Sequence, residues 1–483
     1  MGLLGLVATG VCSMIGAGIN VIPFMIQRHA PGIGPNVLPA FAFAALPAVL
    51  AGLAYAVMAS AMPRAGGSYV YASRGLDPYL GFVASFSQWF SLCVAIGVVS
   101  YLIAPFLRDI AVAAGAPGVG ATLETGAIRL AISLAFLWGA AFVNLRGVKA
   151  YERLIVPLMF LTFVLGAVVI VAGFSFDHAA FAAALRLREG RAVPGIEAPP
   201  LSPSRLLPAS ALLFASFIGF DSIAQAGGES RNPGRNLPLA IGIAVVSVGA
   251  FYMLFTGAVY HAVPWQFIAA EARRRDVTAP GLLGYLLPPA WTVVIVAGAA
   301  VALIKDLPAM LLGVSRLMFA WAEDGIFPRR IAAVHPRFHT PHAAILASAV
   351  MATLGVVGSH LAGDFFLGVD ILVTSMLVNF LLVALSVLTL PGRNAALARA
   401  VTVLPSRRAQ APLAALAVVV LAVFLAVHTW RDLTAPVAAW YFRSTPLWLL
   451  VMAAGSLVYG RETRKLRREG VDVGARFAAL PPG

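Results

Sequence analysis

The chain has 483 residues, of which 60% are hydrophobic and 11% charged, and its formal net charge is +14. Soluble domains carry roughly 45–50% apolar and about 25% charged residues, so this composition excludes a soluble domain and also a disordered chain. Two cysteines, both in apolar runs, exclude a disulfide-stapled secreted scaffold. What remains is a membrane protein with many spanning segments, whose positive charge is expected in loops that face anionic lipid.

Apolar runs long enough to cross a membrane recur along the whole chain. A spanning helix needs about 20 mostly apolar residues, and about twelve such runs are present. They lie near residues 3–28, 36–61, 80–107, 126–144, 152–173, 206–227, 237–262, 290–321, 341–359, 366–390, 411–428 and 446–460. Two connections, 174–204 and 263–289, are long. The runs are too long for barrel strands and do not alternate, so every span is predicted to be helical.

The distribution of lysine and arginine predicts the orientation of the chain in the membrane. If the N-terminus is cytoplasmic, 21 of the 34 basic residues lie in cytoplasmic loops or in the basic tail, and 12 lie on the other side. Many of those 12 are in the two long connections, which weigh less in this rule. Both termini are therefore expected in the cytoplasm. The large excess of arginine over lysine is typical of a GC-rich bacterial genome, which favours a bacterial inner membrane.

Two of the runs contain residues that weaken a helix near the middle of the membrane. The first contains Ile15-Gly16-Ala17-Gly18-Ile19-Asn20, followed by Pro23. The sixth contains Ser216-Phe217-Ile218-Gly219-Phe220-Asp221-Ser222, with a glycine near an acidic residue. Close packing of helices through small residues would also explain the first run. An unpaired carboxylate at that depth costs roughly 2.5–3.5 kcal/mol, so Asp221 is expected to face protein, water or an unwound backbone.

Interrupted first and sixth helices are typical of transporters built from two five-helix units of inverted topology. The N-terminus of a half-helix offers free N–H groups to an anion, and the C-terminus of a half-helix offers carbonyl groups to a cation. An α-amino acid carries both charges close together. A pair of broken helices therefore suits such a zwitterion without a dedicated charged side chain.

Four segments, in order along the chain, resemble motifs of one family. They are Ile15–Ile19 in the first helix, Met62–Tyr71 between the second and third helices, Phe217–Asp221 with Glu229–Pro233 and Pro238 around the sixth, and Ser315-Arg316 with Ala322–Pro328 at the end of the eighth. The motifs resemble those of the amino acid permeases of the amino acid–polyamine–organocation superfamily. They cover about residues 1–390, and four motifs in register are far more specific than one.

The resemblance implies an all-α polytopic membrane protein with about twelve transmembrane helices. It implies a leucine-transporter-like five-plus-five inverted repeat with broken helices 1 and 6. The first repeat is expected in residues 1–173, a long extracytoplasmic loop in 174–204, the second repeat in 205–390, two trailing helices in 391–460 and a basic cytoplasmic tail in 461–483.

Three positions depart from the pattern of the family. Ala17 stands where many members carry serine or threonine, so one hydroxyl contact to a substrate carboxylate is missing. Gly228 stands where the family often has the first of two acidic residues. Some proton-coupled members carry a lysine in the fifth helix, where this chain has Thr162. The proton carrier usual in those members is therefore not expected here.

The substrate is expected at the two breaks, with help from the third span. The predicted binding residues are Ile15, Gly16, Ala17, Gly18, Ile19, Ser216, Phe217, Ile218, Gly219, Asp221 and Ser91. The resemblance favours Phe217 as a lid over the substrate, although a packing role would explain the same residue. Polar residues of the third span, such as Ser91, could equally hold helices together.

Lys305 and Asp306 are the least expected residues, because they lie midway along the eighth run with Pro308 just after them. A structural ion pair with other helices is one explanation, and adjacent residues on a helix point about 100° apart, so they need not pair with each other. The other explanation is a proton-coupling site. In the fold that the resemblance implies, the eighth helix lies against the broken first helix, where a lysine ammonium could replace a coupling cation.

We expect a secondary active transporter of an amino acid or a related amine in the cell (inner) membrane, working by alternating access. Proton coupling is favoured over sodium, because a lysine near the cation position repels sodium. Amino acid or amine exchange is the alternative, and a channel or nontransporting sensor is a further one. An enzyme is not expected, because no nucleophile or metal motif occurs in a suitable context. The expected partners are a small-molecule substrate, protons and the lipid bilayer, with no cofactor, metal or nucleic acid.

Overall fold

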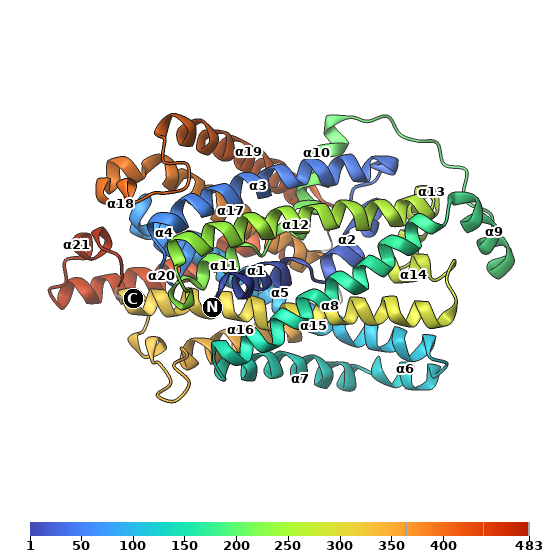
Figure 1. The fold of residues 1–483 in the computed structure, drawn as a ribbon, viewed down its shortest axis with the longest axis horizontal. Helices are drawn as coiled ribbons and strands as arrows, with labels where there is room; N and C mark the ends of the chain where they lie inside the picture. Colours follow the sequence, from blue (N-terminus) through green and yellow to red (C-terminus); the bar gives the residue numbers. More distant parts are fainter. Residues whose placement is uncertain (363–364, 438, 482–483) are drawn as a thin grey trace.

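A computed structural model describes residues 1–362, 365–437 and 439–481 of the chain. Within these residues the chain forms helices joined by loops, and none of them lies in a β-strand (Figure 1). The long helices run roughly side by side along the longest axis of the molecule. The predicted all-α fold class is therefore confirmed.

Ten segments of the described chain are long and apolar enough to cross a membrane. The first combines α1 (Leu3–Met14) and α2 (Ala17–His29). The other nine are α3 (Val37–Ala61), α5 (Pro78–Ala113), α7 (Gly126–Leu145), α8 (Val148–Ser175), α12 (Pro233–Ala262), α15 (Pro289–Asp324), α16 (His342–Ala362), α17 (Phe365–Arg393) and α19 (Arg407–Thr434).

The other two predicted spans are present in a different form. The sixth is divided into α10 (Pro203–Leu213), the 3-10 helix η2 (Phe214–Phe217) and α11 (Asp221–Gln225), which is the predicted break. The twelfth corresponds to α20 (Ser444–Arg468), whose last two turns are rich in arginine and lysine. Because of these charges α20 is less apolar than the ten segments, although its 25 residues are long enough to span a bilayer.

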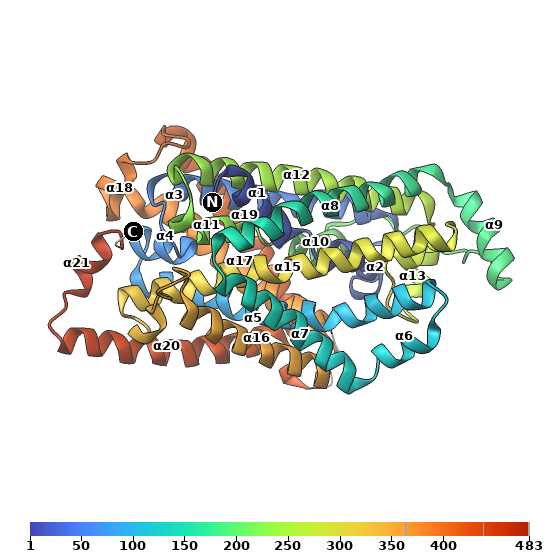
Figure 2. The same ribbon diagram turned by 60° about the horizontal axis from the view of Figure 1, so that its bottom comes forward.

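Both chain ends lie at the same end of the molecule (Figure 2). We call this end the terminal face; it carries Met1, α4 (Gly67–Gly75), α18 (Ala395–Arg399) and α21 (Val473–Ala478). The opposite end, the loop face, carries α6 (Pro117–Leu123), α9 (His178–Glu189), α13 (Trp265–Ala272) and α14 (Ala279–Leu283).

The two long connections are more ordered than the sequence predicted. Residues 174–204 contain α9, whose first turn is capped by Asp177, and residues 263–289 contain α13 and α14. Phe181 of α9 packs against Phe267 of α13, with ring centroids 4.8 Å apart, and against Tyr285 at 5.5 Å. Burial of these aromatic rings stabilises two connections that, by composition alone, were expected to be loops.

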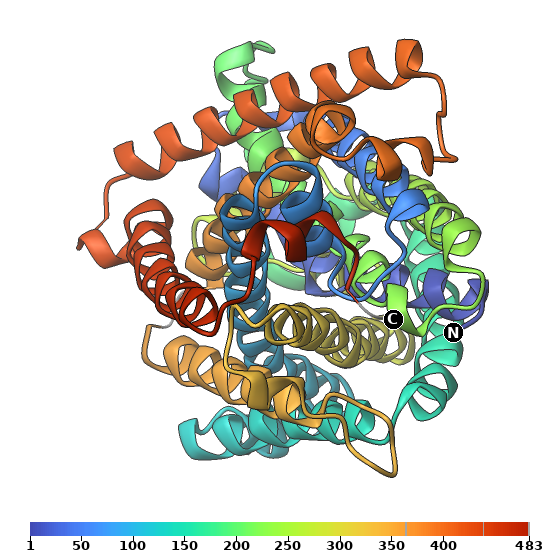
Figure 3. The same ribbon diagram turned by 90° about the vertical axis from the view of Figure 1, so that its left-hand side faces the viewer.

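The interior is formed mainly by α1, α5, α11 and α15, and the outer helices enclose them. Figure 3 views the terminal face, with α15 (yellow) inside and α19 (orange) at the periphery. Outward-facing apolar side chains such as Val164 and Val171 of α8 and Val246 of α12 are exposed. A belt of exposed aliphatic residues on long helices is what a lipid-facing surface requires.

Candidate functional site

The first span is interrupted between α1 and α2. Ile15 follows the last residue of α1, and Gly16 precedes α2 with a non-helical backbone (φ −113°, ψ −144°). A Cβ atom on Gly16 would lie only 2.1 Å from Oδ2 of Asp306, so α15 can approach the break only because this residue is glycine. The first N–H groups of α2 have no side-chain cap. The side chain of Ala17 lies outside the described part of the structure.

The sixth span is interrupted between η2 and α11. Ile218 is extended, and Gly219 has φ +135°, which disfavours any residue with a Cβ. A Cβ atom on Gly219 would lie 2.4 Å from the carbonyl oxygen of Ser13, so the two breaks touch through their backbones. The hydroxyl groups of Ser13 and Ser222, 3.0 Å apart, join the same two segments.

A small cavity of about 70 Å³ lies between the two breaks. The predicted binding residues Gly16, Gly18, Ser216 and Ile218 line it, and so does Asp306. The remaining lining residues are Ser13, Met14, Ile22, Leu92, Ala95, Val98, Val99, Ala215, Met310, Gly368, Val369 and Leu372. We call this space the central cavity.

Three kinds of polar group at the central cavity have no side-chain partner. The N-terminal N–H groups of α2 are uncapped by a side chain, Oγ of Ser216 is buried without a hydrogen bond, and Oδ1 of Asp306 is also buried without one. The N–H groups and the hydroxyl can donate to an anion, and the carboxylate can accept from a cation. Within the described residues no cluster of three His, Cys, Asp or Glu side chains could hold a metal.

Lys305 is fully buried and binds the carbonyl end of α1. Its ammonium group donates to the carbonyl oxygens of Cys12, at 3.2 Å, and of Ile15. The hydroxyl of Tyr252 donates to the intervening carbonyl of Met14. The C-terminus of a helix carries a partial negative charge, so Lys305 occupies the place where a free cation would be most stable. Asp306 points instead toward Gly16 and the central cavity.

Several predicted binding residues lie away from the central cavity. Ile15 and Ile19 line a separate, smaller cavity with Thr162 of α8. Phe217 is buried and packs against Phe41 and Tyr252, with ring centroids at 5.3 and 5.6 Å. In this conformation the ring of Phe217 does not line the central cavity, so the predicted lid role has no contact here to support it.

Asp221 is fully buried in a polar network near the cavity. Its carboxylate accepts from the backbone N–H of Gly219 at 3.1 Å and from the amide of Gln88. Ser68 and Gln225 donate to the side-chain oxygen of Gln88. This network satisfies the expectation that Asp221 faces protein or unwound backbone. The network joins α4, α5 and α11.

Sequence reasoning missed the part of the cavity wall that α5 provides. The prediction chose Ser91, but its hydroxyl donates to the carbonyl of Gln88 in the same helix. The residues of α5 that line the cavity are Leu92, Ala95, Val98 and Val99. They share one face of the helix, at spacings of three, four and seven residues. That pattern becomes informative only when the rotation of α5 is known, since α5 is apolar on most sides.

A second, larger cavity of about 940 Å³ lies at the loop face. The same helices line both cavities, through neighbouring residues: Val21 and Ile22 on α2, Leu102 and Val99 on α5, and Phe366 and Val369 on α17. Its lining is charged, unlike that of the central cavity. The charged residues at its wall are Arg28, Arg108, Asp109, Glu124, Arg129, Arg275 and Asp276.

One side of this outer cavity is tied to α9. The hydroxyl of Tyr285, at the cavity wall, donates to the carboxylate of Glu189 at 2.6 Å. This hydrogen bond, with the nearby Arg191, lowers the pKa of Glu189 below its usual value. Glu271 of α13 accepts from Arg191 and Arg275. These pairs, in which Glu271 is buried and the arginines are partly exposed, join the two long connections at the loop face.

The terminal face is closed by buried ion pairs. Arg74 of α4 binds Asp324 at the end of α15 through two hydrogen bonds of 2.6 and 2.9 Å, and Tyr69 donates to the same carboxylate. Arg316, which precedes Asp324 in α15, binds Glu229. Arg74, Asp324 and Arg316 are buried, and the Glu229 side chain is 20% exposed.

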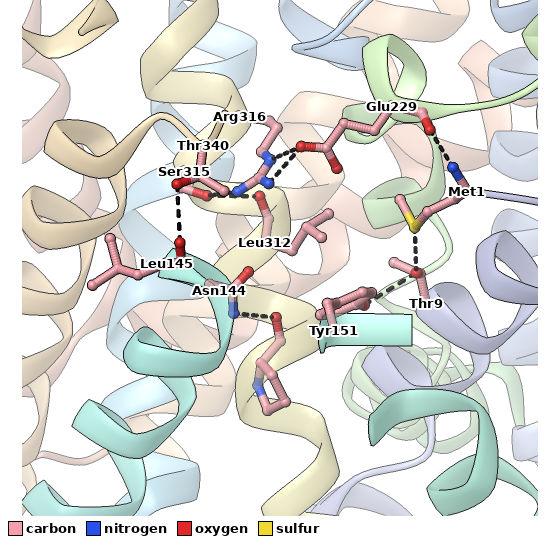
Figure 4. Close-up of polar contacts among 11 residues, drawn as sticks. Met1, Thr9, Asn144, Leu145, Tyr151, Glu229, Leu312, Ser315, Arg316 and Thr340 are labelled. Carbon is pink, nitrogen blue, oxygen red and sulfur yellow. Dashed lines mark hydrogen bonds and ion pairs between the residues drawn. The ribbon is translucent and has the colours of Figure 1, made fainter. Parts of the chain in front are cut away.

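Figure 4 shows how the Arg316–Glu229 pair is joined to the first span. The N-terminal ammonium of Met1 donates to the carbonyl of Glu229, and Thr9 of α1 accepts from Tyr151 of α8 at 3.0 Å. On the other side, Asn144 of α7 donates to the carbonyl of Pro308 in α15 at 3.1 Å. Asn144 and Glu229 therefore contact directly the half of α15 that follows Lys305 and Asp306.

Comparisons with known proteins agree with this architecture. A family model described as amino acid permease matches residues 1–454. An uncharacterized transporter of Mycobacterium tuberculosis is 30% identical over 381 residues, which are 78% of this chain and 78% of the relative. The branched-chain amino acid permease BcaP of Bacillus subtilis is 26% identical over 73% of each chain. Cationic amino acid transporter 4, vacuolar, of Arabidopsis thaliana is 26% identical over 80% of this chain and 62% of the relative.

Proposed function

The chain belongs to the amino acid permease family, and we propose that it is a secondary active transporter of an amino acid or related amine. It would carry this substrate across the cell (inner) membrane by alternating access, coupled to protons. The observation that carries the proposal is the set of unpaired polar groups at the two helix breaks. Groups able to hold a carboxylate and an amine lie there in one small cavity.

The carboxylate of the substrate would bind at the start of α2. Gly18 and Ser216 both line the central cavity, and a Cβ on Gly18 would lie 3.6 Å from Oγ of Ser216. The uncapped N–H groups and this unpaired hydroxyl would together replace the water around an anion. The missing hydroxyl at Ala17 is then compensated from the opposite break. In the proposed repeat arrangement, residues 1–173 supply one half of this site and 205–390 the other.

The coupling proton would be carried by Lys305. Its ammonium group holds two carbonyls at the C-terminus of α1, which is where a transported cation would otherwise bind. Loss of the proton would remove the charge that holds α1 against α15. The protonation state of Lys305 and the position of α1 would then be linked, and each would shift the other by the same free energy.

The arrangement of the two faces supports alternating access. With both termini in the cytoplasm, as the basic residues indicate, the loop face is extracytoplasmic and its cavity is the entry route for substrate. The buried ion pairs Arg74–Asp324 and Arg316–Glu229 would then close the cytoplasmic side. Transport would require these pairs to separate while the loop face closes.

Uptake into liposomes tests both the function and the coupling. The purified protein should accumulate at least one of the twenty amino acids or a related amine against its gradient when a pH gradient is applied. Lys305→Met keeps much of the side-chain length but cannot titrate, so it should abolish uptake driven by the pH gradient while retaining substrate binding. Coupling like that of the wild type in correctly folded Lys305→Met protein would exclude Lys305 as the carrier, and Asp306 would be tested next.

Exchange of two solutes is the second candidate function, because exchange needs no net proton movement. Liposomes that contain the protein and are preloaded with unlabelled substrate would then take up labelled substrate without a pH gradient. Lys305→Met would not change the rate of this exchange. A nontransporting sensor would bind substrate and show neither activity.

A further inference from the structure

Asp306 is a buried carboxylate that the protein leaves unpaired. Its side chain is only 5% exposed, and Oδ1 has no hydrogen-bond partner. Among the ion pairs of the described residues, none includes Asp306, because the adjacent Lys305 is turned toward the carbonyls of α1. A buried carboxylate without a partner is strongly unfavourable. Such a group is retained where a cation binds to it during function.

The residues that line the central cavity include no cationic side chain that could pair with Asp306. Asp306 is the one charged side chain among the described residues that line it, and most of the others are aliphatic, such as Ile22, Leu92, Val98 and Leu372. A ligand that pairs with Asp306 must therefore bring its own positive charge. The rest of that ligand must be apolar, except for the part that reaches the start of α2.

The carbonyl groups at the end of α1, which could accept from an amine, are already occupied. The carbonyls of Cys12 and Ile15 at the end of α1 accept from Lys305, and the carbonyl of Met14 accepts from Tyr252. An amine entering the break would have to displace a side chain from these oxygens. The carboxylate of Asp306, beside Gly16, is free.

We propose that Asp306 binds the protonated amine of the substrate, and that the central cavity selects a compact aliphatic amino acid or monoamine. This inference rests on the proposed function, because it assumes that the central cavity is the transport site. The amine would lie between Asp306 and Gly16, the carboxylate would lie between α2 and Ser216, and the aliphatic side chain would face α5 and α17. A second positive charge would find no acceptor, so lysine and arginine would be excluded.

The test compares L-valine with 2-hydroxy-3-methylbutanoate, which replaces only the amine by a hydroxyl. Binding to the purified full-length protein is measured by titration calorimetry, with isobutylamine and L-arginine as further probes. Wild type should bind valine about 10- to 100-fold more tightly than the hydroxy acid, which is the range for one charge-assisted hydrogen bond. In Asp306→Asn this ratio should fall to near one through loss of valine affinity. Arginine should bind neither protein.

Ser216→Ala is the matched comparison within the same cavity. It removes a contact to the carboxylate, which valine and the hydroxy acid share, so it should weaken both ligands equally and keep their ratio. An unchanged ratio in Asp306→Asn would overturn the proposal and assign the amine to backbone carbonyls. A change in pH dependence with an unchanged ratio would make Asp306 a proton carrier and would overturn it as well.

A second pair of variants keeps the test decisive if Asp306→Asn does not fold. The Cβ of Gly16→Ala would meet Oδ2 of Asp306 at 2.1 Å and should displace it, lowering the ratio. The Cβ of Gly18→Ala meets nothing closer than 3.4 Å and should leave the ratio intact. Equal ratios in these two variants would contradict the proposal. Wild-type protein that takes up none of the twenty amino acids and no related amine would overturn the proposed function itself, whereas uptake of other amino acids without valine binding would overturn only the aliphatic assignment.

Discussion

Adjacent residues in this protein have separate partners. Lys305 and Asp306 follow each other in α15, yet the ammonium group reaches the end of α1 and the carboxylate reaches Gly16. The two side chains point in different directions because successive helical residues are rotated by about 100°. The sequence therefore already indicated that Lys305 and Asp306 need not pair with each other. The partners themselves were not predictable, because they depend on how α15 is rotated against α1.

Gly219 is the residue where backbone strain and close approach coincide. Its φ is +135°, and a Cβ atom added there would lie 2.4 Å from the carbonyl oxygen of Ser13, so there is no room for a side chain. Gly219→Ala should therefore destabilise the protein by roughly 1–3 kcal/mol, the usual range for such strain. The measurement is the melting temperature of the purified protein in detergent.

Gly242 of α12 provides the control for this substitution. It is exposed on a regular helix, and a Cβ there meets nothing within 4 Å. Gly242→Ala should leave stability unchanged or raise it by up to about 1 kcal/mol, because alanine favours a helix more than glycine does. A fall in melting temperature of equal size in both variants would refute the role assigned to Gly219.

Helix breaks were predictable at the scale of elements, and helix rotation was not. Glycine, proline, asparagine and aspartate inside apolar runs conflict with a continuous helix, so α1–α2 and η2–α11 could be located from sequence. On α5 the prediction selected Ser91 because it is polar, although the cavity wall is made by Leu92, Ala95 and Val99. The role of Phe217 stays a prediction for a related reason. A residue beside a break can face either side of it, and here the ring packs against Phe41 and Tyr252.

The polar network between α4, α5 and α11 should depend on Gln88. This side chain donates to Asp221 and accepts from Ser68 and Gln225. Gln88→Leu would leave these buried groups without a partner, which should cost roughly 1–3 kcal/mol of stability. Ser91→Ala, three residues later on the same helix, removes a hydroxyl that bonds only within α5 and should change stability little. Thermal unfolding of both variants, monitored by tryptophan fluorescence, provides the comparison, and equal melting temperatures would refute the assignment.

At the scale of the whole molecule, the all-helical class and the spans followed from hydropathy, because lipid leaves few other structures possible. The order within 174–204 and 263–289 did not follow, because it arises from contacts such as Phe181 with Phe267 between distant segments. The ion pairs that close the terminal face could not be predicted from the sequence either. Arg74 and Asp324 are 250 residues apart in the chain, yet they form a buried pair.

The C-terminal tail completes this closure. The backbone carbonyl of Ala479 accepts from Nε of Arg74 at 3.1 Å, and the ring of Phe477 lies 4.8 Å from its guanidinium carbon. Phe477 is itself buried, so the tail covers the Arg74–Asp324 pair and keeps water away from it. Ion pairs screened by water are much weaker than buried ones. Removal of the Phe477 ring should therefore weaken the closure of the terminal face.

Reaction of Cys12 with a maleimide can measure this effect. Cys12 and Cys93 are both buried free thiols, so a Cys93→Ser background leaves one reporter on α1. We expect this thiol to become accessible when α1 separates from α8 as the terminal face opens. In Phe477→Ala the labelling rate should rise several-fold, because hydration of the Arg74–Asp324 pair stabilises the open state relative to the closed one. Arg468→Ala removes an exposed charge from α20, just before the tail, and should leave the rate unchanged. An unchanged rate in Phe477→Ala would show that the ion pairs alone keep the terminal face closed and that the tail only covers them.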